Sequence, residues 1–463
     1  MALDLEIGAV FLEAVRASLP ELRLLTDPLD LEAYRRDETA HLDPPPPLAV
    51  ALPTETREVA ELLRLASAHR VPVVPRGAGT GLSGGSVAVA GGLTIAFTRM
   101  DRILEIDRGN LCVVTQPGVI NARLKAAVAE VGLFYPPDPA SYEQCSIGGN
   151  LGTNAGGLCC VKYGVTRDAV LGLEVVLADG TVVRLGGRNV KDVAGYGLIQ
   201  LLVGSQGTLG LITEATLRLR PEPPPKATLL AFFASLTAAG EAVAGITAAG
   251  VQPCTLELMD RFTIAAVDDW QRLGMDREAE AMLLVESDLP GAAAEGELDR
   301  AQACCEAAGA SGLVRSTDPQ EADWLRQGRR LAFRALERLG AALMEDVGVP
   351  RSRVPELLVA IQGVAERHRV RIGTFGHVGD GNLHPTFITE REDPAAPALL
   401  EAARADLYRA ALDLGGTVTG EHGIGTARRD WLEVQRGPDA LRMMRAIKAA
   451  LDPLGILNPG KVL

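Results

Sequence analysis

Short apolar runs alternate with glycine-rich turns over residues 48–221, which is typical of short strands rather than long helices. A period of 3.6 appears only twice in this region, and it predicts helices over residues 56–68 and 121–131. Asp179-Gly180 lies between two β-branched runs and predicts a hairpin with a two-residue turn. The pattern therefore indicates an α+β fold dominated by short strands.

The pattern changes at residues 221–225, where four of five positions are proline and favour an extended linker. Beyond it, the apolar periods predict the order strand, helix, strand, strand, helix, ending with a helix over residues 295–308, as in a ferredoxin-like sheet. We expect an N-terminal helical segment, a first domain, a second domain and a segment that returns to the first domain, over residues 1–43, 44–223, 224–414 and 415–463.

The composition of the chain argues against several classes of function. The formal net charge of −13 and the pI of about 5.1 argue against non-specific nucleic-acid binding, although a local arginine can still bind a small anion. No run of eighteen apolar residues is present, and the acidic first twenty residues predict an amphipathic helix rather than a signal peptide. Seven cysteines without a C-x-x-C pair fit a reducing cytoplasm. Peripheral attachment to the inner face of a membrane and a homodimer stay open.

The loop "PRGAGTGLSGG", residues 75–85, follows a predicted strand and contains the G-x-G-x-x-G pattern of dinucleotide-binding folds. That pattern should open a long helix, but the next residues, "SVAVAGGLTIAF", are β-like, so a Rossmann fold is disfavoured. We interpret the loop as a nest of backbone N–H groups for a phosphate, with a flexible turn as the alternative. Similar loops at residues 146–157 and 204–213 predict a long cofactor with several phosphates.

Two histidines flank an Asp-Gly pair in "FGHVGDGNLHP", residues 375–385. If Asp380-Gly381 forms a two-residue turn, His377 lies opposite His384 on one sheet face, at a separation that suits two imidazoles on one metal. A slip of one residue would place them on opposite faces, and two unrelated histidines are the alternative. "GEHG" adds Glu421 as a third candidate ligand and His422 beside it.

These motifs together resemble a known family. "PRGAGTGLSGG", "PPDPAS", "SIGGNLGTNAGG" and "GSQGTLGLIT" resemble the FAD-binding domain of the vanillyl-alcohol-oxidase type flavoproteins. "GHVGDGNLHP", "GEHGIG" and "LDPLGILNPGKVL" resemble one branch, which contains the glycolate oxidase FAD subunit, D-lactate dehydrogenase and D-2-hydroxyglutarate dehydrogenase. The resemblance runs from about residue 40 to residue 463. It implies a two-subdomain FAD-binding domain, a ferredoxin-like cap for the substrate, and a C-terminal segment that packs on the flavin domain.

The resemblance implies FAD contacts along all three glycine loops and from the tail. They fall on Arg76, Gly77, Gly79, Thr80, Gly81, Ser83, Gly84, Pro136, Ser141, Gly148, Gly149, Asn150, Thr153, Asn154, Gly207, Ile212 and Asn458. Some relatives attach FAD covalently through a histidine of the first loop. This loop has none, so we expect non-covalent FAD.

The same resemblance implies His377, His384 and Glu421 as ligands of a divalent metal, zinc or manganese, and His422 as the general base. A 2-hydroxy acid would be oxidised to the 2-oxo acid with hydride transfer to flavin N5. Asn382 is expected to bind the substrate, and Arg329 its carboxylate, with Arg326 as the alternative.

The expected substrate is a small D-2-hydroxy acid. Met344 stands where relatives that act on 2-hydroxyglutarate carry a lysine, so D-lactate or glycolate is favoured over D-2-hydroxyglutarate.

No iron–sulfur or haem motif is present, so the electrons are expected to leave to a quinone, a cytochrome, an electron-transfer flavoprotein or an iron–sulfur partner subunit. An ether-lipid synthase relative and a flavin subunit that acts only within an electron-transfer complex are the competing hypotheses.

Overall fold

The computed structural model describes residues 5–39, 41–316 and 318–463, without the side chains of residues 5, 319, 321, 322, 324 and 325. The chain divides into two compact units. Unit 1 comprises Met1–Gly156, Val165–Glu222 and Glu421–Leu463, and unit 2 comprises Gly157–Gly164 and Pro223–Gly420. The predicted boundaries after residues 223 and 414 thus differ by one and six residues from the division points after residues 222 and 420. The excursion of residues 157–164 into unit 2 has no counterpart in the sequence pattern.

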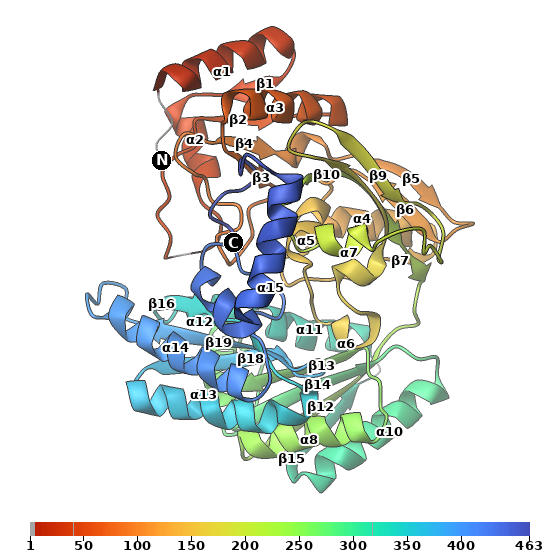
Figure 1. The fold of residues 1–463 in the computed structure, drawn as a ribbon. Coiled ribbons are helices and arrows are strands. Elements are labelled where there is room, and N and C mark those ends of the chain that lie inside the picture. The colour runs from red at the N-terminus through yellow and green to blue at the C-terminus, as the bar shows by residue number, and fades with distance from the viewer. Residues whose placement is uncertain (1–4, 40, 317) are drawn as a thin grey trace. The chain divides into compact units, whose positions relative to one another are not determined.

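Unit 1 contains a four-stranded sheet in the order β1 (Arg23–Leu25), β2 (Ala49–Leu52), β4 (Leu93–Ala96), β3 (Val73–Arg76). Strand β4 is parallel to both β2 and β3. The helices α1 (Leu5–Ser18) and α3 (Thr56–His69) pack on each other and on this sheet, as Figure 1 shows, and α2 (Pro28–Arg35) lies nearby. The helix predicted over residues 56–68 is confirmed.

A second, five-stranded antiparallel sheet of unit 1 has the order β5-β6-β10-β8-β9. Its strands are β5 (Ile103–Asp107), β6 (Cys112–Thr115), β8 (Val170–Val176), β9 (Val182–Gly186) and β10 (Leu211–Arg218). The helices α4 (Asn121–Ala129), α5 (Ile147–Thr153) and α7 (Leu198–Leu202) contribute to its core, as does the end of α15 (Arg429–Leu451). A two-stranded pair, β7 (Leu133–Phe134) and β11 (Arg220–Pro221), completes the strands of this unit.

The hairpin at Asp179-Gly180 is confirmed, but its turn is not the predicted two-residue turn. Leu177 N–H donates to Thr181 O, so three residues lie between the closing pair. Gly180 takes the last of these positions with φ of +86°. A glycine in the left-handed region ends the common three-residue loop, which explains why the Asp-Gly pair is displaced by one position.

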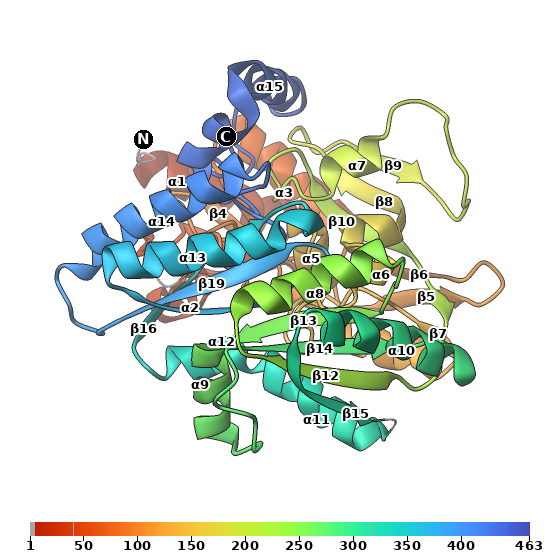
Figure 2. The same ribbon diagram turned by 90° about the horizontal axis from the view of Figure 1, so that it is seen from below.

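Unit 2 is built on an eight-stranded sheet. Seven strands follow the order β15 (Ala310–Ser316), β12 (Ala227–Phe233), β14 (Ala281–Ser287), β13 (Thr255–Asp260), β18 (Arg371–His377), β19 (Asn382–Thr389), β16 (Ala341–Met344), and β17 (Val347–Gly348) also pairs with β19. Figure 2 shows α8 (Leu236–Ala248), α10 (Ala292–Ala307) and α13 (Val354–His368) in front of the strands, with α14 (Ala396–Asp413) beside α13.

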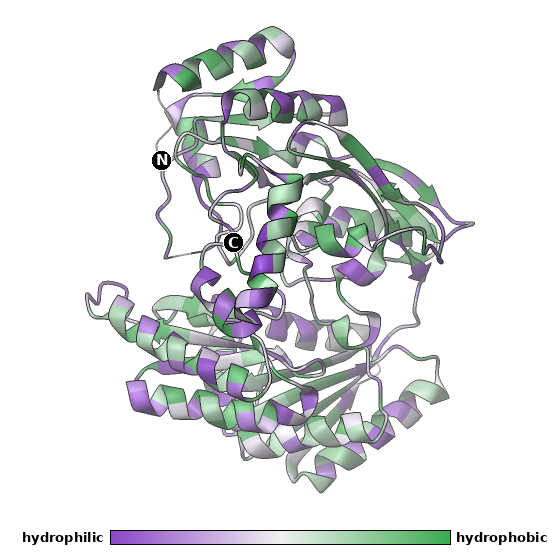
Figure 3. Ribbon diagram, in the orientation of Figure 1, coloured by the Kyte–Doolittle hydropathy of each residue, from purple (hydrophilic) through white to green (hydrophobic). Residues whose placement is uncertain are grey.

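The opposite face of this sheet is covered by α9 (Arg261–Gln271), α11 (Pro319–Arg330) and α12 (Ala332–Glu337). Figure 3 shows that the strands are mainly hydrophobic, whereas the helices alternate hydrophobic and hydrophilic positions. The predicted element order is wrong at one point, because α9 separates β13 from β14. Its start is fixed by Asp260, whose carboxylate accepts the N–H of Thr263 at 2.8 Å.

Candidate functional site

The three glycine loops of unit 1 meet at positions where no side chain fits. A Cβ on Gly77, in the first loop, would lie 2.3 Å from Ser146 Oγ and 3.2 Å from Gly149 N in the second loop. A Cβ on Gly207, in the third loop, would lie 2.2 Å from Cγ of Pro75. The glycines thus allow the loops to approach each other backbone to backbone.

Arg76 places a buried positive charge at the start of the first loop. It is 8% exposed, and its guanidinium lies 5.9 Å from the centre of the Tyr34 ring. Its Nη1 atom is buried and has no hydrogen-bond partner among the described residues. Burial lowers the pKa of this guanidinium, and the negative charge of Asp37 opposes that effect. A buried cation with an unsatisfied donor suits an anionic phosphate group.

The polar side chains of the second loop that were predicted to contact FAD form hydrogen bonds within unit 1. Asn150 donates to Cys145 Sγ and accepts from Asn121 Nδ2 at 3.0 Å. Thr153 donates to the Gly149 carbonyl. Asn154 ends α5 with φ of +55° and accepts the N–H of Arg167 at 2.8 Å. These side chains shape the loop.

Other predicted cofactor contacts also make bonds inside unit 1. Gly84 N–H donates to Thr39 Oγ1 at 2.7 Å, and the carbonyl of Pro136 accepts from Lys125. The carbonyl of Gly81 accepts from Glu38. The remaining predicted positions are held by the backbone or by packing. Gly79 has φ of +82° and Thr80 follows it in the first loop, while Gly148 packs on Pro117. The carbonyl of Ser141 accepts the N–H groups of Gln144 and Cys145, and Ile212 packs against the core of the five-stranded sheet.

Asn458 and Gln206 connect the loops to the C-terminal segment. Asn458 Nδ2 donates to Gly85 O at 2.9 Å and to Gln206 O at 2.6 Å, and its backbone N–H donates to Val73 O. Gln206 in turn accepts the N–H of Gly425 at 2.8 Å through Oε1. The amide hydrogens of Asn458 are therefore used by the protein, and Oδ1 has no partner among the described residues.

Ser83 determines the position of the His422 backbone. Its hydroxyl donates to His422 O at 2.9 Å and accepts from Gln206 Nε2 at 3.3 Å. The carbonyl of Ser83 accepts the N–H groups of Thr426 and Ala427. A hydroxyl has one hydrogen, so in this arrangement Ser83 Oγ cannot also donate to a phosphate.

The predicted register of the histidine hairpin is wrong. His377 pairs with Asn382, and His384 pairs with Phe375, so the strands are shifted by two residues from the prediction. Four residues form the loop instead of two, and Gly381 takes φ of +88° at its end. Val349 N–H donates to the carbonyl of Gly381, so contacts outside the hairpin hold the loop open.

A shift of two residues leaves the face of each side chain unchanged, because side chains alternate with a period of two. His377 and His384 therefore still share one face as diagonal neighbours. Their ring centroids are 5.2 Å apart with an interplanar angle of 86°. The residues are 6% and 3% exposed.

A buried carboxylate contacts the first of these histidines. Glu257 lies on the neighbouring strand β13, is 1% exposed, and accepts from His377 Nδ1 at 2.7 Å through Oε1. Its second oxygen, Oε2, lies 2.7 Å from Nη2 of Arg329. The Arg329 guanidinium also stacks on Phe375, with 4.7 Å between its carbon and the ring centroid.

Arg326, the alternative carboxylate-binding residue, lies one helical turn earlier on α11. Its Nη1 is 2.5 Å from Oε1 of Glu286, which also contacts Lys226 at 2.9 Å. These two cations lower the pKa of the Glu286 carboxyl, against the effect of burial.

Asp346 fixes the chain that leads to Glu421. Its Oδ1 accepts from Asn382 Nδ2 at 2.8 Å, and its Oδ2 accepts from Thr419 Oγ1 at 2.7 Å. A Cβ on Gly420 would lie 2.3 Å from Asn382 Nδ2, which explains the glycine before Glu421. Asn382 also donates to Val347 O at 3.0 Å, so only its Oδ1 remains for a substrate.

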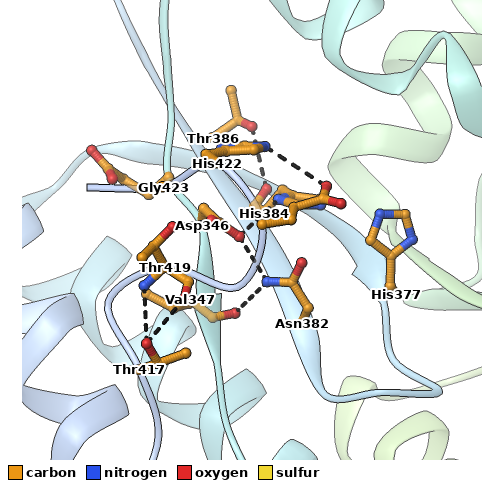
Figure 4. Close-up of polar contacts among 12 residues, drawn as sticks. Asp346, Val347, His377, Asn382, His384, Thr386, Thr417, Thr419, His422 and Gly423 are labelled. Atoms are coloured by element: carbon orange, nitrogen blue, oxygen red, sulfur yellow. Dashed lines mark hydrogen bonds and ion pairs between the residues drawn. The ribbon is translucent and has the colours of Figure 1, made fainter. Parts of the chain in front are cut away.

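Two overlapping groups could hold a metal ion. Ligand atoms of His377, His384 and Glu421 lie within 4.8 Å of one another, and so do those of Asp346, His384 and His422. Figure 4 shows His384 next to Asp346, His422 and Asn382, with His377 on the other side of His384. Glu421 Oε1 is 3.8 Å from His422 Nε2.

Glu257, Asp346 and Gln206 are the polar residues that the sequence analysis missed. Glu257 had a visible signal, since an acid in the middle of the apolar strand "TLELMD" requires a buried partner. Asp346 lies two positions after the end of β16 at Met344, and its neighbour Glu345 pairs with Arg404 at 2.6 Å and with Tyr408. Nothing in the local pattern distinguished Asp346 from an ordinary turn residue.

Comparison with known protein families places the chain. A model described as "FAD binding domain" matches residues 47–186, and one described as "FAD linked oxidases, C-terminal domain" matches residues 222–462. The chain belongs to the FAD-linked oxidase family. The family resemblance inferred from the motifs is thereby confirmed, and the oxidase is an FAD-dependent oxidoreductase. Solved structures of the same fold confirm the fold class.

Named relatives and solved structures agree with this placement. The oxidase is 45% identical over 417 residues to the glycolate oxidase subunit GlcD of Bacillus subtilis, covering 90% of this chain and 89% of the relative. It is 34% identical over 467 residues to a D-lactate dehydrogenase of Anaerostipes hadrus, covering 97% and 96%. The structure of p-cresol methylhydroxylase has the same fold, with a TM-score of 0.84, 18% identity, and 99% and 97% of the two chains covered. In the part of the oxidase that the structure describes, none of the helices has the length and hydrophobicity of a membrane span.

Proposed function

We propose that this oxidase converts a small D-2-hydroxy acid, D-lactate or glycolate, to the 2-oxo acid, with FAD as electron acceptor and a divalent metal as assistant. The observation that carries the proposal is the convergence of His377, His384 and Glu421, whose ligand atoms lie within 4.8 Å of one another. Relatives named for glycolate and D-lactate support the substrate class.

The donor set supports a metal of the zinc or manganese type, because two imidazoles and one carboxylate are common ligands for both. His377 supports it further, since its Nδ1 is bonded to Glu257 and its Nε2 is the remaining ligand atom. The alternative group is less suitable. Both oxygens of Asp346 already accept hydrogen bonds, from Asn382 and Thr419. This leaves His422 for proton transfer.

A bound divalent ion would polarise the substrate hydroxyl and lower its pKa. FAD, held non-covalently by the glycine loops and Arg76, would accept the hydride from the substrate Cα at flavin N5. The protein supplies the other steps. His422 removes the hydroxyl proton, as a neutral imidazole can near pH 7. Its backbone is fixed by the hydrogen bond from Ser83, which restricts the positions that its ring can take.

Arg329 is the proposed partner of the substrate carboxylate. It is 3% exposed, and both Glu257 and the Phe375 ring restrain its guanidinium. Asn382 offers the substrate only Oδ1, so we propose that it accepts a hydrogen bond rather than donating one.

Met344 supports a substrate without a second carboxylate. It lies on β16, opposite Thr386, and packs against a hydrophobic core that includes Phe375. An apolar side chain at this position offers no positive charge to a distal carboxylate, so D-2-hydroxyglutarate is disfavoured.

The electrons would then leave the flavin for an acceptor: a quinone, a cytochrome, an electron-transfer flavoprotein or an iron–sulfur partner subunit. The Bacillus relative is named as a subunit of glycolate oxidase, which favours a partner protein for this oxidase also.

The test is anaerobic flavin reduction with a panel of D- and L-2-hydroxy acids, with and without a chelator. We expect D-lactate or glycolate to bleach the flavin, and prior chelation to slow the bleaching. His422→Asn should lower the rate about 10²–10⁴-fold with FAD retained, because proton removal by a positioned base contributes about that factor.

His368→Asn is the matched control, because His368 pairs with Asp406 on the helical side of unit 2 and has no role in the mechanism. Full reduction by His422→Asn at the wild-type rate, or no bleaching with any 2-hydroxy acid, would refute the proposal.

A further inference from the structure

Unit 2 contains two buried carboxylates on the sheet face below α11. Glu257 on β13 and Glu286 on β14 are 1% and 0% exposed. Each contacts one arginine of α11, Arg329 and Arg326 respectively. Only Glu257 also bonds a histidine.

The bond to Glu257 determines which nitrogen of His377 carries hydrogen. An ionised carboxylate only accepts hydrogen bonds, so the Nδ1 atom at 2.7 Å must donate. The neutral ring then has its lone pair on Nε2, which is the form that can bind a metal. Carboxylates bonded to metal-binding histidines fix the ring in this way in other proteins.

The second oxygen of Glu257 performs a separate task. It contacts Arg329 Nη2, on the opposite side of the carboxylate from the histidine bond. One rigid carboxylate group therefore restrains both an imidazole and a guanidinium. The contact with His377 is a directional hydrogen bond, and the contact with Arg329 is an ion pair, so the carboxylate fixes the plane of the ring and the position of the guanidinium.

From this geometry we infer that Glu257 is a positioning residue that holds His377 in its Nδ1–H tautomer and orients Arg329 at the same time. The roles of Arg329 and of the metal in this inference rest on the proposed function, whereas the assignment of the His377 tautomer is independent of it. A neutral amide cannot replace Glu257. Glutamine has one accepting oxygen, so either His377 or Arg329 would face an N–H group. If the amide N–H faces Nδ1, the ring must move its hydrogen to Nε2 and lose its lone pair there.

The first measurement is ¹⁵N NMR of protein labelled at histidine, which has only six such residues. It is made on metal-free holoprotein with FAD bound, at a pH of about 8.5, above the usual imidazole pKa of about 6.5. Wild-type His377, assigned from the signal lost in His377→Asn, should show Nδ1–H alone. Glu257→Gln should show the Nε2–H form or a mixture.

The second measurement is the affinity of the chelator-treated holoprotein for Zn²⁺ and Mn²⁺, from competition with a chromogenic chelator. Glu257→Gln should bind about 10–100-fold more weakly, the usual effect of removing such a partner. At saturating metal, its KM for the hydroxy acid should also rise, because Arg329 has lost its restraint.

Glu286→Gln is the matched control. It removes an equally buried carboxylate from an arginine of the same helix without contacting a histidine. We expect its His377 tautomer and metal affinity to equal those of the wild type, even if its stability falls. Flavin absorbance and far-ultraviolet circular dichroism would establish that both variants are folded.

The outcomes separate the two proposals. An Nε2–H tautomer in wild-type His377, an unchanged tautomer in Glu257→Gln, or equal loss of metal in both variants would overturn the positioning role. Absence of stoichiometric metal binding in the wild type would overturn the metal part of the proposed function, and the tautomer comparison would still decide the role of Glu257.

Discussion

Several buried acids of unit 2 are held by hydrogen bonds or ion pairs, and Asp260 is one whose ionisation is altered by its surroundings. Its two oxygens accept the N–H groups of Thr263 and Thr374 at 2.8 and 2.7 Å. Burial raises its pKa to about 6, and these hydrogen bonds oppose the rise. The folded protein thus binds a proton at this carboxyl between about pH 4 and 6, where the unfolded chain does not.

We predict that Asp260→Asn reveals this as a pH-dependent difference in stability. The carboxyl stabilises the fold most below its unfolded pKa, and that contribution is lost as the pH rises through about 6. The wild type should therefore lose stability relative to the variant as the pH rises. The difference between their free energies of unfolding should fall by on the order of 2–3 kcal/mol between pH 4 and 7. Urea unfolding at a series of pH values measures it, and a flat difference would show that the carboxyl titrates normally.

At the scale of elements, the loop of the histidine hairpin depends on one glycine. Gly381 has φ of +88°, and a Cβ there would lie 2.1 Å from the carbonyl oxygen of Val349. The loop connects β18 and β19, so its shape determines the register that brings His377 and His384 onto one face.

We predict that Gly381→Ala lowers the free energy of unfolding by about 2–4 kcal/mol and reduces metal affinity, because strain and a backbone clash add. Gly415→Ala is the control, since Gly415 has φ of +77° but no atom within 4 Å of its Cβ position. It should cost only about 1 kcal/mol. Equal losses in the two variants would mean that the contact with Val349 has no influence.

The elements show where sequence analysis succeeds and where it does not. Asp179-Gly180 and Asp380-Gly381 correctly marked hairpins, because a left-handed glycine is a local requirement. Both turns were one or two residues longer than predicted. In the second, Val349 bonds to the loop from 32 positions away, since its N–H donates to the carbonyl of Gly381. A local pattern carries no information on such a contact.

The candidate site likewise contains residues that could be predicted from the sequence and one that could not. The motifs "GHVGDGNLHP" and "GEHG" supplied five of its candidate residues: His377, Asn382, His384, Glu421 and His422. Glu257 lies 120 positions before His377 and becomes its partner only because β13 and β18 are neighbours in the sheet. Sheet order across such a distance is a property of the whole fold, so this carboxylate could be suspected as buried but not assigned.

At the scale of the molecule, unit 1 is made from three separate stretches of chain, and Leu457 and Asn458 are among the residues that join them. Leu457 bridges to Val73, the first residue of β3, and Asn458 donates to the carbonyls of Gly85 and Gln206. The last stretch therefore holds the first and third glycine loops together.

We predict that Asn458→Ala destabilises unit 1 by about 2–4 kcal/mol, because two buried carbonyls lose their donors. Asn458 has φ of +43°, which alanine tolerates less well. Asn458→Gly separates these causes, since it removes the side chain without the backbone strain. Urea unfolding and flavin release on dilution would measure the effect. Firm flavin retention by both variants would show that the loops need no such connection.

Unit 1 contains residues from before and after unit 2, so its completion depends on the order in which the chain is synthesised. Residues 421–463 leave the ribosome only after all of unit 2. Yet Leu457 pairs with Val73, 384 positions earlier, and Asn458 bonds to Gly85, 373 positions earlier. Domains usually fold as they emerge. Here the nascent first part must wait, with its glycine loops unsecured, while a complete second unit folds. Loading of FAD should accordingly be a late event in biosynthesis.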